Sequence, residues 1–482
     1  MPLAKRSCLP QQFYMRDINL KKNDVIELKI TDITVNSEGA GRYNGFAFFV
    51  KDALPGDEVR AVVTKINKGY GYAKTLEIIS PSKDRVLPAC PLARKCGGCQ
   101  LMELDYKSQL RLKENRVQKD LEKLGGLSPD KFRCEPVIAM DADCPLHFRN
   151  KVQLPFGRDK NGRVICGFYA GRTHCIVETK SCPAAFEEAD ILTAAAVRFI
   201  EENALSVYDE KTKKGLVRHI LLRKAFGTGQ IMVCLVAHPE YKDEAKDPGI
   251  IKIKASFARE IRQACPDVKS VCLNINTKNT NVILGEKTLL LGGKDYIEDT
   301  IEDLVFHISA PSFFQVNPAQ TKKLYAKALE YAALTGKETV WDLYCGTGTI
   351  SLFLARAAKQ VFGIETVPAA IENAKENAAL NKIENVQFFC GKAEELFRGM
   401  CEGNADVVVL DPPRKGCEKA LLESLLEVCP ERIVYVSCSS ATLARDIKFL
   451  SGKYELTAAA PCDMFPHTNH CEVVTCLRRK AL

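Results

Sequence analysis

The sequence predicts a multidomain α/β protein with an N-terminal OB-like β-barrel, a central α+β region and a C-terminal Rossmann-like domain. At 482 residues the chain exceeds what one hydrophobic core normally supports. The pattern changes from short strands alone to alternating strands and helices after about residue 300, which is typical of a parallel sheet flanked by helices. The predicted domain boundaries are therefore 20–82, 83–300 and 301–482.

The barrel is predicted by period-two patterning. Residues 24–33 alternate apolar with charged or polar side chains, and strand-like runs follow at 45–50, 58–66 and 71–79, separated by turn sequences such as LPGD and NKGYG. Four or five short strands in this space predict a small barrel, a fold that often binds oligonucleotides. Its aromatic residues either fill the small core, the commoner role, or stack bases on an open face. They are Tyr43, Phe46, Phe48, Tyr70 and Tyr72.

The central region begins with a cysteine loop and a charged helical stretch at 104–126 that ends in a Gly pair suited to a C-cap. Residues 83–180 hold 19 Lys or Arg against 12 Asp or Glu, so this stretch carries nearly all of the net charge of +8. A concentrated positive stretch favours binding to a phosphate backbone, although a solvated surface without a partner gives the same count.

Two absences predict a cytoplasmic protein with no membrane contact. The N-terminal sequence lacks the apolar core of a secretory signal, and no apolar run approaches the ~18 residues of a membrane span. In the cytoplasm the 21 cysteines are expected to stay reduced. Reduced thiols that cluster favour metal ligation or catalysis.

The cysteine loop CPLARKCGGCQ places Cys90, Cys96 and Cys99 within ten residues, and two glycines permit a tight turn between the last two. Zinc sites usually contain two Cys-x2-Cys pairs. One such pair with an outlying thiol is closer to the spacing of a cubane iron–sulfur cluster. Zinc is the first alternative and unligated structural thiols the second; Cys166, Cys175 and Cys182 are all near enough in sequence to supply a fourth ligand.

The first strand and helix of the C-terminal domain suggest a nucleoside-type ligand. Gly346 and Gly348 follow an apolar strand and allow close approach of the backbone to a ligand. Glu365 ends the next strand, where a carboxylate can accept hydrogen bonds from ribose hydroxyls. Ser351 replaces the third glycine of a dinucleotide fingerprint, and Asp342 suits an amino group, so the pattern favours S-adenosylmethionine over NAD.

Two later strands end at side chains that could take part in a reaction. Asp411 follows an apolar strand, and the two prolines after it make a rigid loop at the mouth of the sheet. Cys438 follows the strand-like run 432–436 and precedes a helical run. A residue there faces the crevice of an open α/β sheet, so Cys438 is a candidate nucleophile; an inert buried thiol is the alternative.

Five motifs stand in the last part of the chain: SFFQVN (312–317), DLYCGTGT (342–349), LDPPRKG (410–416), SCSSATLARD (437–446) and FPHTNHCE (465–472). Together they resemble the RNA uracil-C5 methyltransferases, specifically the 23S ribosomal RNA (uracil-5-)-methyltransferase type. The N-terminal sequences GAGRYNGFAFFV and ALPGDEV resemble the TRAM domain attached to many of these enzymes. Cys90-x5-Cys96-x2-Cys99, with Cys182 in KSCP, is similar to the cluster-binding set of the family.

The resemblance implies a class I methyltransferase domain and a role for each matched residue. Cys438 matches the nucleophile and Glu472 the general base, while the matched cysteines imply a [4Fe-4S] cluster held by Cys90, Cys96, Cys99 and Cys182. The implied S-adenosylmethionine contacts are Gln315, Tyr344, Glu365 and Asp411. Lys392 stands where many methyltransferases place an acid beside adenine, so Glu394 or a backbone carbonyl is expected to replace that contact.

The implied reaction is S-adenosylmethionine-dependent methylation of C5 of a flipped-out uridine in RNA, with 23S ribosomal RNA as the first candidate and transfer RNA as the alternative. An RNA cytosine-C5 methyltransferase would carry a second cysteine where this chain has Arg414. An amino-group methyltransferase needs no Cys438, and an inactive RNA-binding protein needs neither Cys438 nor Glu472. No obligate protein partner is expected.

Overall fold

The structure is a computed structural model that describes residues 19–171, 173–241, 243–401 and 403–481. It divides into two compact units. The first contains the described residues up to Leu87 together with Glu103–Asp105, and the second contains Pro88–Met102 and the described residues from Tyr106 onward. No helix in these described ranges is both long and apolar enough to cross a membrane.

The first unit is a closed five-stranded barrel with the order β1-β2-β3-β5-β4, as the alternation pattern predicts. Of the five aromatic residues considered for its core, Phe48 is fully buried, whereas Tyr70 is 38% exposed. The rings of Phe49, Tyr70 and Tyr72 lie 5.5 to 5.8 Å apart and form one aromatic group on the barrel. The strands are β1 (Val25–Ile33), β2 (Gly39–Tyr43), β3 (Phe46–Lys51), β4 (Glu58–Ile66) and β5 (Tyr70–Ser80).

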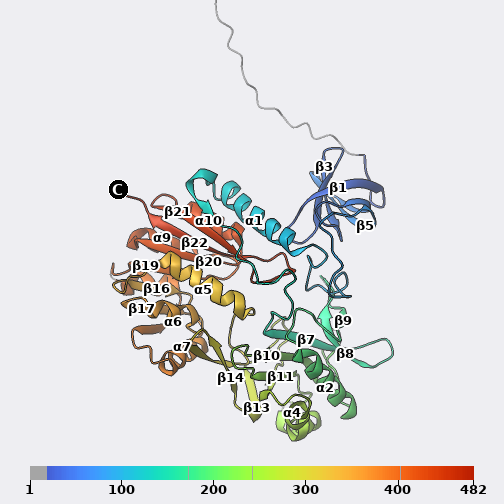
Figure 1. Ribbon diagram of the computed structural model, residues 1–482. Helices are drawn as coiled ribbons and strands as arrows, with labels where there is room; N and C mark the ends of the chain where they lie inside the picture. The colour runs from blue at the N-terminus through green and yellow to red at the C-terminus, as the bar shows by residue number, and fades with distance from the viewer. Residues whose placement is uncertain (1–18, 172, 242, 402, 482) are drawn as a thin grey trace, which may run out of the picture. The chain divides into compact units, whose positions relative to one another are not determined.

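The second unit contains a seven-stranded sheet with the order β13-β12-β11-β10-β7-β8-β9 (Figure 1). One face packs on α2 (Glu188–Glu202), α3 (Pro248–Lys252) and α4 (Ala258–Ala264), while the other joins the core of the C-terminal domain. Its strands are β7 (Lys151–Arg158), β8 (Val164–Tyr169), β9 (Ile176–Glu178), β10 (Val217–Lys224), β11 (Ile231–Ala237), β12 (Val268–Ile275) and β13 (Lys287–Gly293). The hairpin β14 (Tyr296–Ile301) and β15 (Leu304–Ser309) then leads into the C-terminal domain.

The C-terminal domain is built on an eight-stranded sheet with the order β18-β17-β16-β19-β20-β22-β21-β6. The first five strands in this order are parallel, and β22 lies antiparallel between β20 and β21. The strands are β16 (Thr339–Leu343), β17 (Gln360–Glu365), β18 (Val386–Cys390), β19 (Val407–Leu410), β20 (Arg432–Ser437), β21 (Tyr454–Cys462), β22 (Glu472–Arg479) and β6 (Arg133–Cys134).

Helices cover both faces of this sheet (Figure 1). One face packs on α5 (Pro318–Ala332), α6 (Thr349–Ala355) and α7 (Pro368–Leu380). The other packs on α1 (Tyr106–Lys123), α8 (Ala393–Cys401), α9 (Lys419–Val428) and α10 (Ser440–Leu450). Thus α1 packs on the C-terminal sheet and β6 pairs with β21 within it, although both fall in the predicted range 83–300. The three-part boundaries stay a prediction from the sequence pattern.

Candidate active site and cysteine cavity

The turn between β16 and α6 has the open backbone that its glycines predict. Gly346 and Gly348 have φ angles of 55° and 80°, in the left-handed region that favours glycine. A Cβ atom at Gly348 would also lie 2.9 Å from the ring of Phe388. Glu365, at the end of β17, accepts hydrogen bonds from the backbone N–H groups of Gly346 (3.3 Å) and Val367 (2.9 Å), so it holds this turn against its own strand.

Asp342 on β16 is fully buried at the floor of the same turn. The hydroxyl of Ser351 donates to its Oδ2 atom over 2.5 Å, which explains why serine stands where a dinucleotide fingerprint has glycine. Its Oδ1 atom has no hydrogen-bond partner among the described residues. Burial raises the pKa of Asp342 to about 7. A buried carboxylate oxygen without a donor suits the amino group of a ligand.

Gln315 lies on the loop between β15 and α5, and that loop is held by one side chain just before β7 and by another on β10. Asn150 donates from Nδ2 to the backbone oxygen of Gln315 over 3.0 Å. Arg223 on β10 is 4% exposed and donates to the backbone oxygen of Ser312. Sequence reasoning missed both residues; the available signal was Arg223, which directly follows the apolar run 220–222 of β10.

The other predicted cofactor residues line the same end of the sheet at different depths. Tyr344 is half-buried beside Cys417, and burial together with that thiol raises its pKa. Asp411 directly follows β19, and burial followed by the charge of Asp342 raises its pKa to about 7. Lys392 pairs at the surface with Glu395, with 2.7 Å between its Nζ atom and the nearer carboxylate oxygen.

Cys438 and Glu472 are brought together by strand pairing. Ser437, the last residue of β20, pairs with Val473 on antiparallel β22. Continuing this register by one residue sets Cys438 opposite Glu472 at the end of the ladder. Cys438 is half-buried and immediately precedes Ser439, the N-cap of α10, while Glu472 is 7% exposed.

The electrostatics of this pair are dominated by burial. Burial and the neighbouring Glu472 carboxylate raise the pKa of Cys438 to about 11. Burial and the neighbouring Asp411 raise the pKa of Glu472 to about 8. The Arg414 guanidinium acts in the opposite direction on both groups. A carboxylate of that pKa is a stronger base than an ordinary glutamate and is poised near neutral pH.

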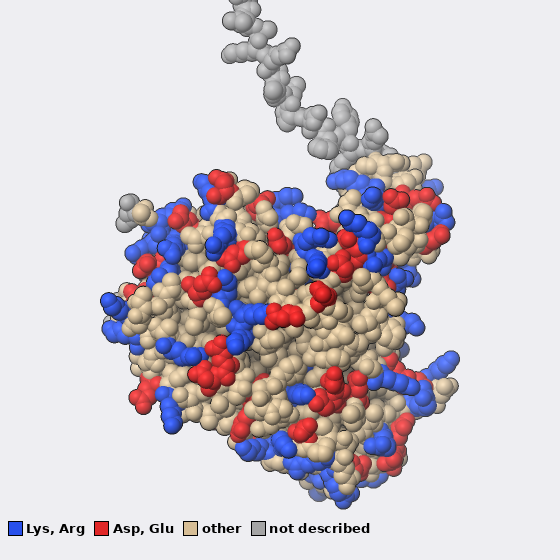
Figure 2. All heavy atoms as spheres, in the orientation of Figure 1, with Lys and Arg blue, Asp and Glu red and all other residues tan. Residues whose placement is uncertain are grey.

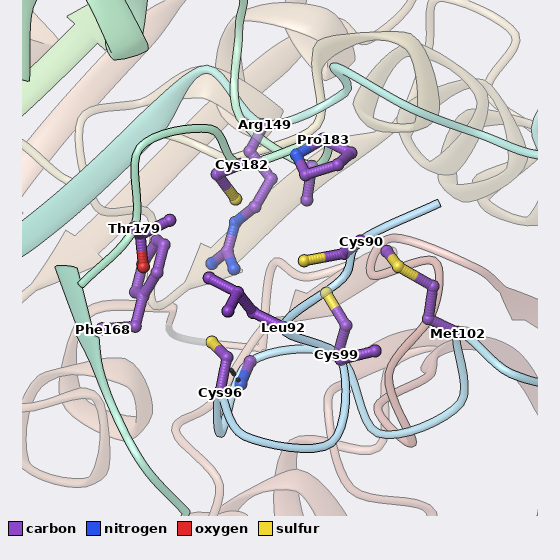
Figure 3. Close-up of a pocket in the computed structure, with 13 residues that line it drawn as sticks. Cys90, Leu92, Cys96, Cys99, Met102, Arg149, Phe168, Thr179, Cys182 and Pro183 are labelled. Atoms are coloured by element: carbon purple, nitrogen blue, oxygen red, sulfur yellow. Dashed lines mark hydrogen bonds between the residues drawn. The ribbon is translucent and has the colours of Figure 1, made fainter. Parts of the chain in front are cut away.

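A separate cavity of about 70 Å³ is lined by all four predicted cluster cysteines, which come from two distant segments (Figure 3). Its volume is several times the ~10–15 Å³ that one water molecule needs. The sulfur atoms of Cys90 and Cys99 point toward one another, and the guanidinium group of Arg149 reaches in among the thiols. Cys182 completes the lining, whereas Cys175 is exposed and Cys166 packs in the sheet core.

The cysteine loop is shaped by a close backbone approach. A Cβ atom at Gly97 would lie 3.0 Å from the backbone of Gly171, so a larger residue there would push the two segments apart. The Gly98 N–H group donates to the Cys96 sulfur over 3.4 Å (Figure 3). Burial raises the pKa of the Cys99 thiol to about 12, and the charge of Arg149 acts against this rise.

Arg149 is the charged group of this cavity, and its Nε atom has no hydrogen-bond partner in the described part of the chain. No three His, Cys, Asp or Glu side chains of the described residues are grouped closely enough to hold a metal ion. On the face of the second unit seen in Figure 2, basic and acidic side chains intermingle.

Two family models match the chain. The model described as tRNA (Uracil-5-)-methyltransferase matches residues 252–480, and the model described as TRAM domain matches residues 20–76. An uncharacterized RNA methyltransferase of Halalkalibacterium halodurans is 46% identical over 464 residues, which cover 96% of this chain and 98% of that protein. The chain belongs to the RNA (uracil-5-)-methyltransferase family. The resemblance of the sequence motifs to the RNA uracil-C5 methyltransferases is thereby confirmed at the level of the family.

Two further proteins that are similar to this chain support the same family. An uncharacterized RNA methyltransferase of Clostridium acetobutylicum is 46% identical over 465 residues, or 96% of this chain and 98% of that protein. The crystal structure of Pyrococcus abyssi tRNA (uracil-54, C5)-methyltransferase in complex with S-adenosyl-L-homocysteine superposes with a TM-score of 0.71 and 27% identity. It covers 94% of this chain and 100% of that one. The TRAM barrel and the C-terminal methyltransferase fold are confirmed.

Proposed function

We propose that this protein methylates C5 of a specific uridine in RNA, with Cys438 as nucleophile and Glu472 as general base. The observation that carries the proposal is the pairing of β20 with β22, whose register sets the thiol opposite the carboxylate at the crevice end of the sheet. Family membership supplies the reaction class, and the geometry supplies the two groups that uracil C5 chemistry needs.

Uracil C5 is too weak a nucleophile to take a methyl group directly. Addition of the Cys438 thiolate to C6 turns the ring into an enolate whose electron pair reaches C5. C5 then attacks the methyl carbon of the donor, and the bond between that carbon and the donor's sulfur would break with its electron pair staying on sulfur, so that S-adenosylhomocysteine leaves. Glu472 next takes the C5 proton, and the electron pair of that C–H bond rebuilds the C5–C6 double bond as the thiolate leaves. Arg414 and the N-terminus of α10 favour the thiolate against the burial that raises the pKa of Cys438.

S-adenosylmethionine, when bound, supplies the methyl group. We assign its binding to the glycine turn with Gln315, Tyr344, Glu365 and Asp411. Support comes from the Oδ1 atom of buried Asp342, which has no hydrogen-bond partner among the residues that the structure describes and suits the ligand's amino group. The superposable Pyrococcus abyssi enzyme is bound to S-adenosyl-L-homocysteine.

We also propose that Cys90, Cys96, Cys99 and Cys182 hold a [4Fe-4S] cluster, with zinc as the alternative. A single zinc ion would need four sulfur atoms at ~2.3 Å from one point. Four thiols spread around a cavity of about 70 Å³ favour a larger group. The Arg149 guanidinium, whose Nε atom is buried, offsets the negative charge that such thiolates would bring. Methyl transfer needs no electron, so the cluster is assigned a structural or RNA-positioning role.

The proposed RNA is 23S ribosomal RNA, because the barrel and the cysteine set resemble that branch of the family. Transfer RNA is the second candidate, because the Pyrococcus abyssi enzyme is named as a tRNA (uracil-54, C5)-methyltransferase. In either RNA the target base is stacked and must be flipped into the crevice. The TRAM barrel, which carries an exposed aromatic group, is assigned to the flanking strand.

Mechanism-based trapping tests the reaction and the substrate together. Fluorine at C5 cannot leave as a proton, so 5-fluorouridine RNA and S-adenosylmethionine should give a slowly migrating covalent complex on a denaturing gel. The complex is expected with wild type and absent from Cys438→Ala. Parallel reactions with ribosomal and transfer RNA identify the target. No complex with any 5-fluorouridine RNA would contradict the proposed function, and a complex with 5-azacytidine RNA alone would indicate a cytosine enzyme.

A further inference from the structure

Helix α1 buries polar side chains where a helix normally buries apolar ones. Gln109 and Lys113 lie one turn apart on its inner face and are 0% and 1% exposed, and Tyr106 is 7% exposed. All three contact the segment 463–467, which leads to Glu472. The helix thus meets the chain next to the proposed base with hydrogen-bonding groups.

The first contact is a buried ion pair. Lys113 pairs with Asp463, and both side chains have 0% exposure. The ammonium group also donates to the backbone oxygen of Phe465 over 3.1 Å, and the hydroxyl of Tyr106 donates to Asp463 over 2.8 Å. Each charge therefore has its opposite charge and at least one further hydrogen bond, the arrangement that a buried pair requires.

The second contact fixes His467, which has a φ angle of 63° and is buried. Gln109 accepts from the His467 N–H group over 2.9 Å, and its amide nitrogen lies 3.3 Å from Nδ1. The other ring nitrogen lies 2.7 Å from the backbone oxygen of Pro145. Because a carbonyl only accepts, Nε2 carries the proton and Nδ1 accepts from Gln109. Burial lowers the pKa of His467, which keeps this neutral tautomer.

Helix α1 also contacts the chain close to Glu472 and Cys438 themselves. Arg116 donates to the backbone oxygen of Asn469 over 2.8 Å, three residues before Glu472. Farther along α1, the carboxylate of Asp120 accepts from the hydroxyl of Ser440 over 2.5 Å, two residues after Cys438. One helix thus contacts the chain beside both proposed catalytic groups.

Stability alone does not account for this polar face. Replacing a buried ion pair by well-packed apolar residues is often neutral or stabilising, so such pairs are weak indicators of a gain in stability. Directional hydrogen bonds instead fix one arrangement of the segment they hold. A general base loses activity steeply when it is displaced, on the order of 100-fold for ~1 Å.

We propose that Gln109, Lys113 and Asp463 are positioning residues that fix Glu472 for removal of the C5 proton. This inference rests on the proposed function of Glu472. The cysteine loop contacts the same segment, because the N–H group of Leu101, two residues after Cys99, donates to the backbone oxygen of His467 over 2.8 Å. The loop that lines the cysteine cavity and the segment that leads to the base are therefore hydrogen-bonded to each other.

The test separates addition from elimination. Bond formation by Cys438 and methyl transfer precede proton removal, so a displaced base leaves a covalent protein–RNA complex on ordinary uridine RNA. Gln109→Ala is expected to accumulate this complex, as Glu472→Gln should, and to release methylated RNA on the order of 100-fold more slowly. Gln118→Ala is the matched control, because Gln118 lies on the same helix but bonds to Glu122 of α1. It is expected to behave as wild type.

A second variant guards against loss of folding. Lys113→Met with Asp463→Asn removes both charges together and keeps an acceptor for Tyr106, so no unpaired buried charge remains. It is expected to melt near wild type and still accumulate the complex. Release at the wild-type rate, or parallel loss of complex and product in variants that melt normally, would overturn the inference. Absence of the 5-fluorouridine complex in wild type would instead overturn the proposed function.

Discussion

At the scale of single residues, the sequence identifies candidate site residues by their position at the ends of predicted strands. The structure adds the hydrogen-bond partners and charges that determine their chemistry. Asp342 illustrates this. Its position before the glycine turn suggests contact with an amino group, but only the fold shows that Ser351 occupies Oδ2 and leaves Oδ1 without a partner among the described residues. Serine at position 351 is thereby explained as a partner of this carboxylate.

Asp342→Asn is expected to weaken S-adenosylmethionine binding by about tenfold, since a charge-assisted hydrogen bond becomes a neutral one. Because burial raises the pKa of Asp342 to about 7, wild-type binding should tighten as pH rises from 6 to 8, while the variant should show a flatter dependence. Titration calorimetry measures both. RNA affinity serves as the internal control and should stay unchanged. Equal affinities of the two proteins at pH 8 would contradict this assignment.

At the scale of elements, the cysteine loop is the most informative. Its three thiols line one cavity with Cys182, which lies in the segment after β9, and only folding brings the two segments together. The spacing of three cysteines predicts a metal site, but three downstream cysteines compete for the fourth place. Folding puts Cys182 at the cavity, leaves Cys175 exposed and buries Cys166 in the sheet core. The spacing of cysteines in the sequence could not identify the fourth cysteine, because its position at the cavity depends on how β8 and β9 pair.

Cys96→Ala is expected to lower the melting temperature by several degrees before it changes the chemical step, because a site whose ligands come from two segments joins them only when it is loaded. Differential scanning calorimetry of the purified protein, with its iron and zinc content measured, is the appropriate experiment. Cys175→Ala is the matched control, since that thiol is exposed and does not line the cavity. A Cys96→Ala protein with wild-type stability would argue against a structural cluster.

At the scale of the whole molecule, patterning recovered the barrel and the order of strand ends in the C-terminal domain, because period-two and strand–helix alternation are local signals. It did not recover the packing of α1. Its charged residues suggest a solvated helix, yet Lys113 is buried against Asp463, which lies 350 positions away in sequence. Interactions at that separation are decided by tertiary packing, which local patterns do not encode.

The buried carboxyl groups also make a prediction for the molecule as a whole. Burial raises the pKa values of Asp342, Asp411 and Glu472 to about 7, 7 and 8, above their ordinary values near 4. The folded state therefore holds these protons more tightly than the unfolded state, and their contribution to stability is lost as pH rises from about 4 to 8. Melting temperatures of the protein without S-adenosylmethionine should fall across that range. Glu472→Gln should flatten the fall, and an unchanged slope would contradict the raised pKa.

The position of β22 has a consequence for synthesis. This strand pairs between β20 and β21, yet the ribosome makes it after both. A nascent chain that has released β21 but not β22 presents two strands without the neighbour that will join them, and such unpaired edges promote association with other chains. It also lacks Glu472, the first residue of β22. When β22 pairs between β20 and β21, it covers both edges and places the proposed base Glu472 in the site. Protection from aggregation and catalytic activity should therefore appear at the same moment of synthesis.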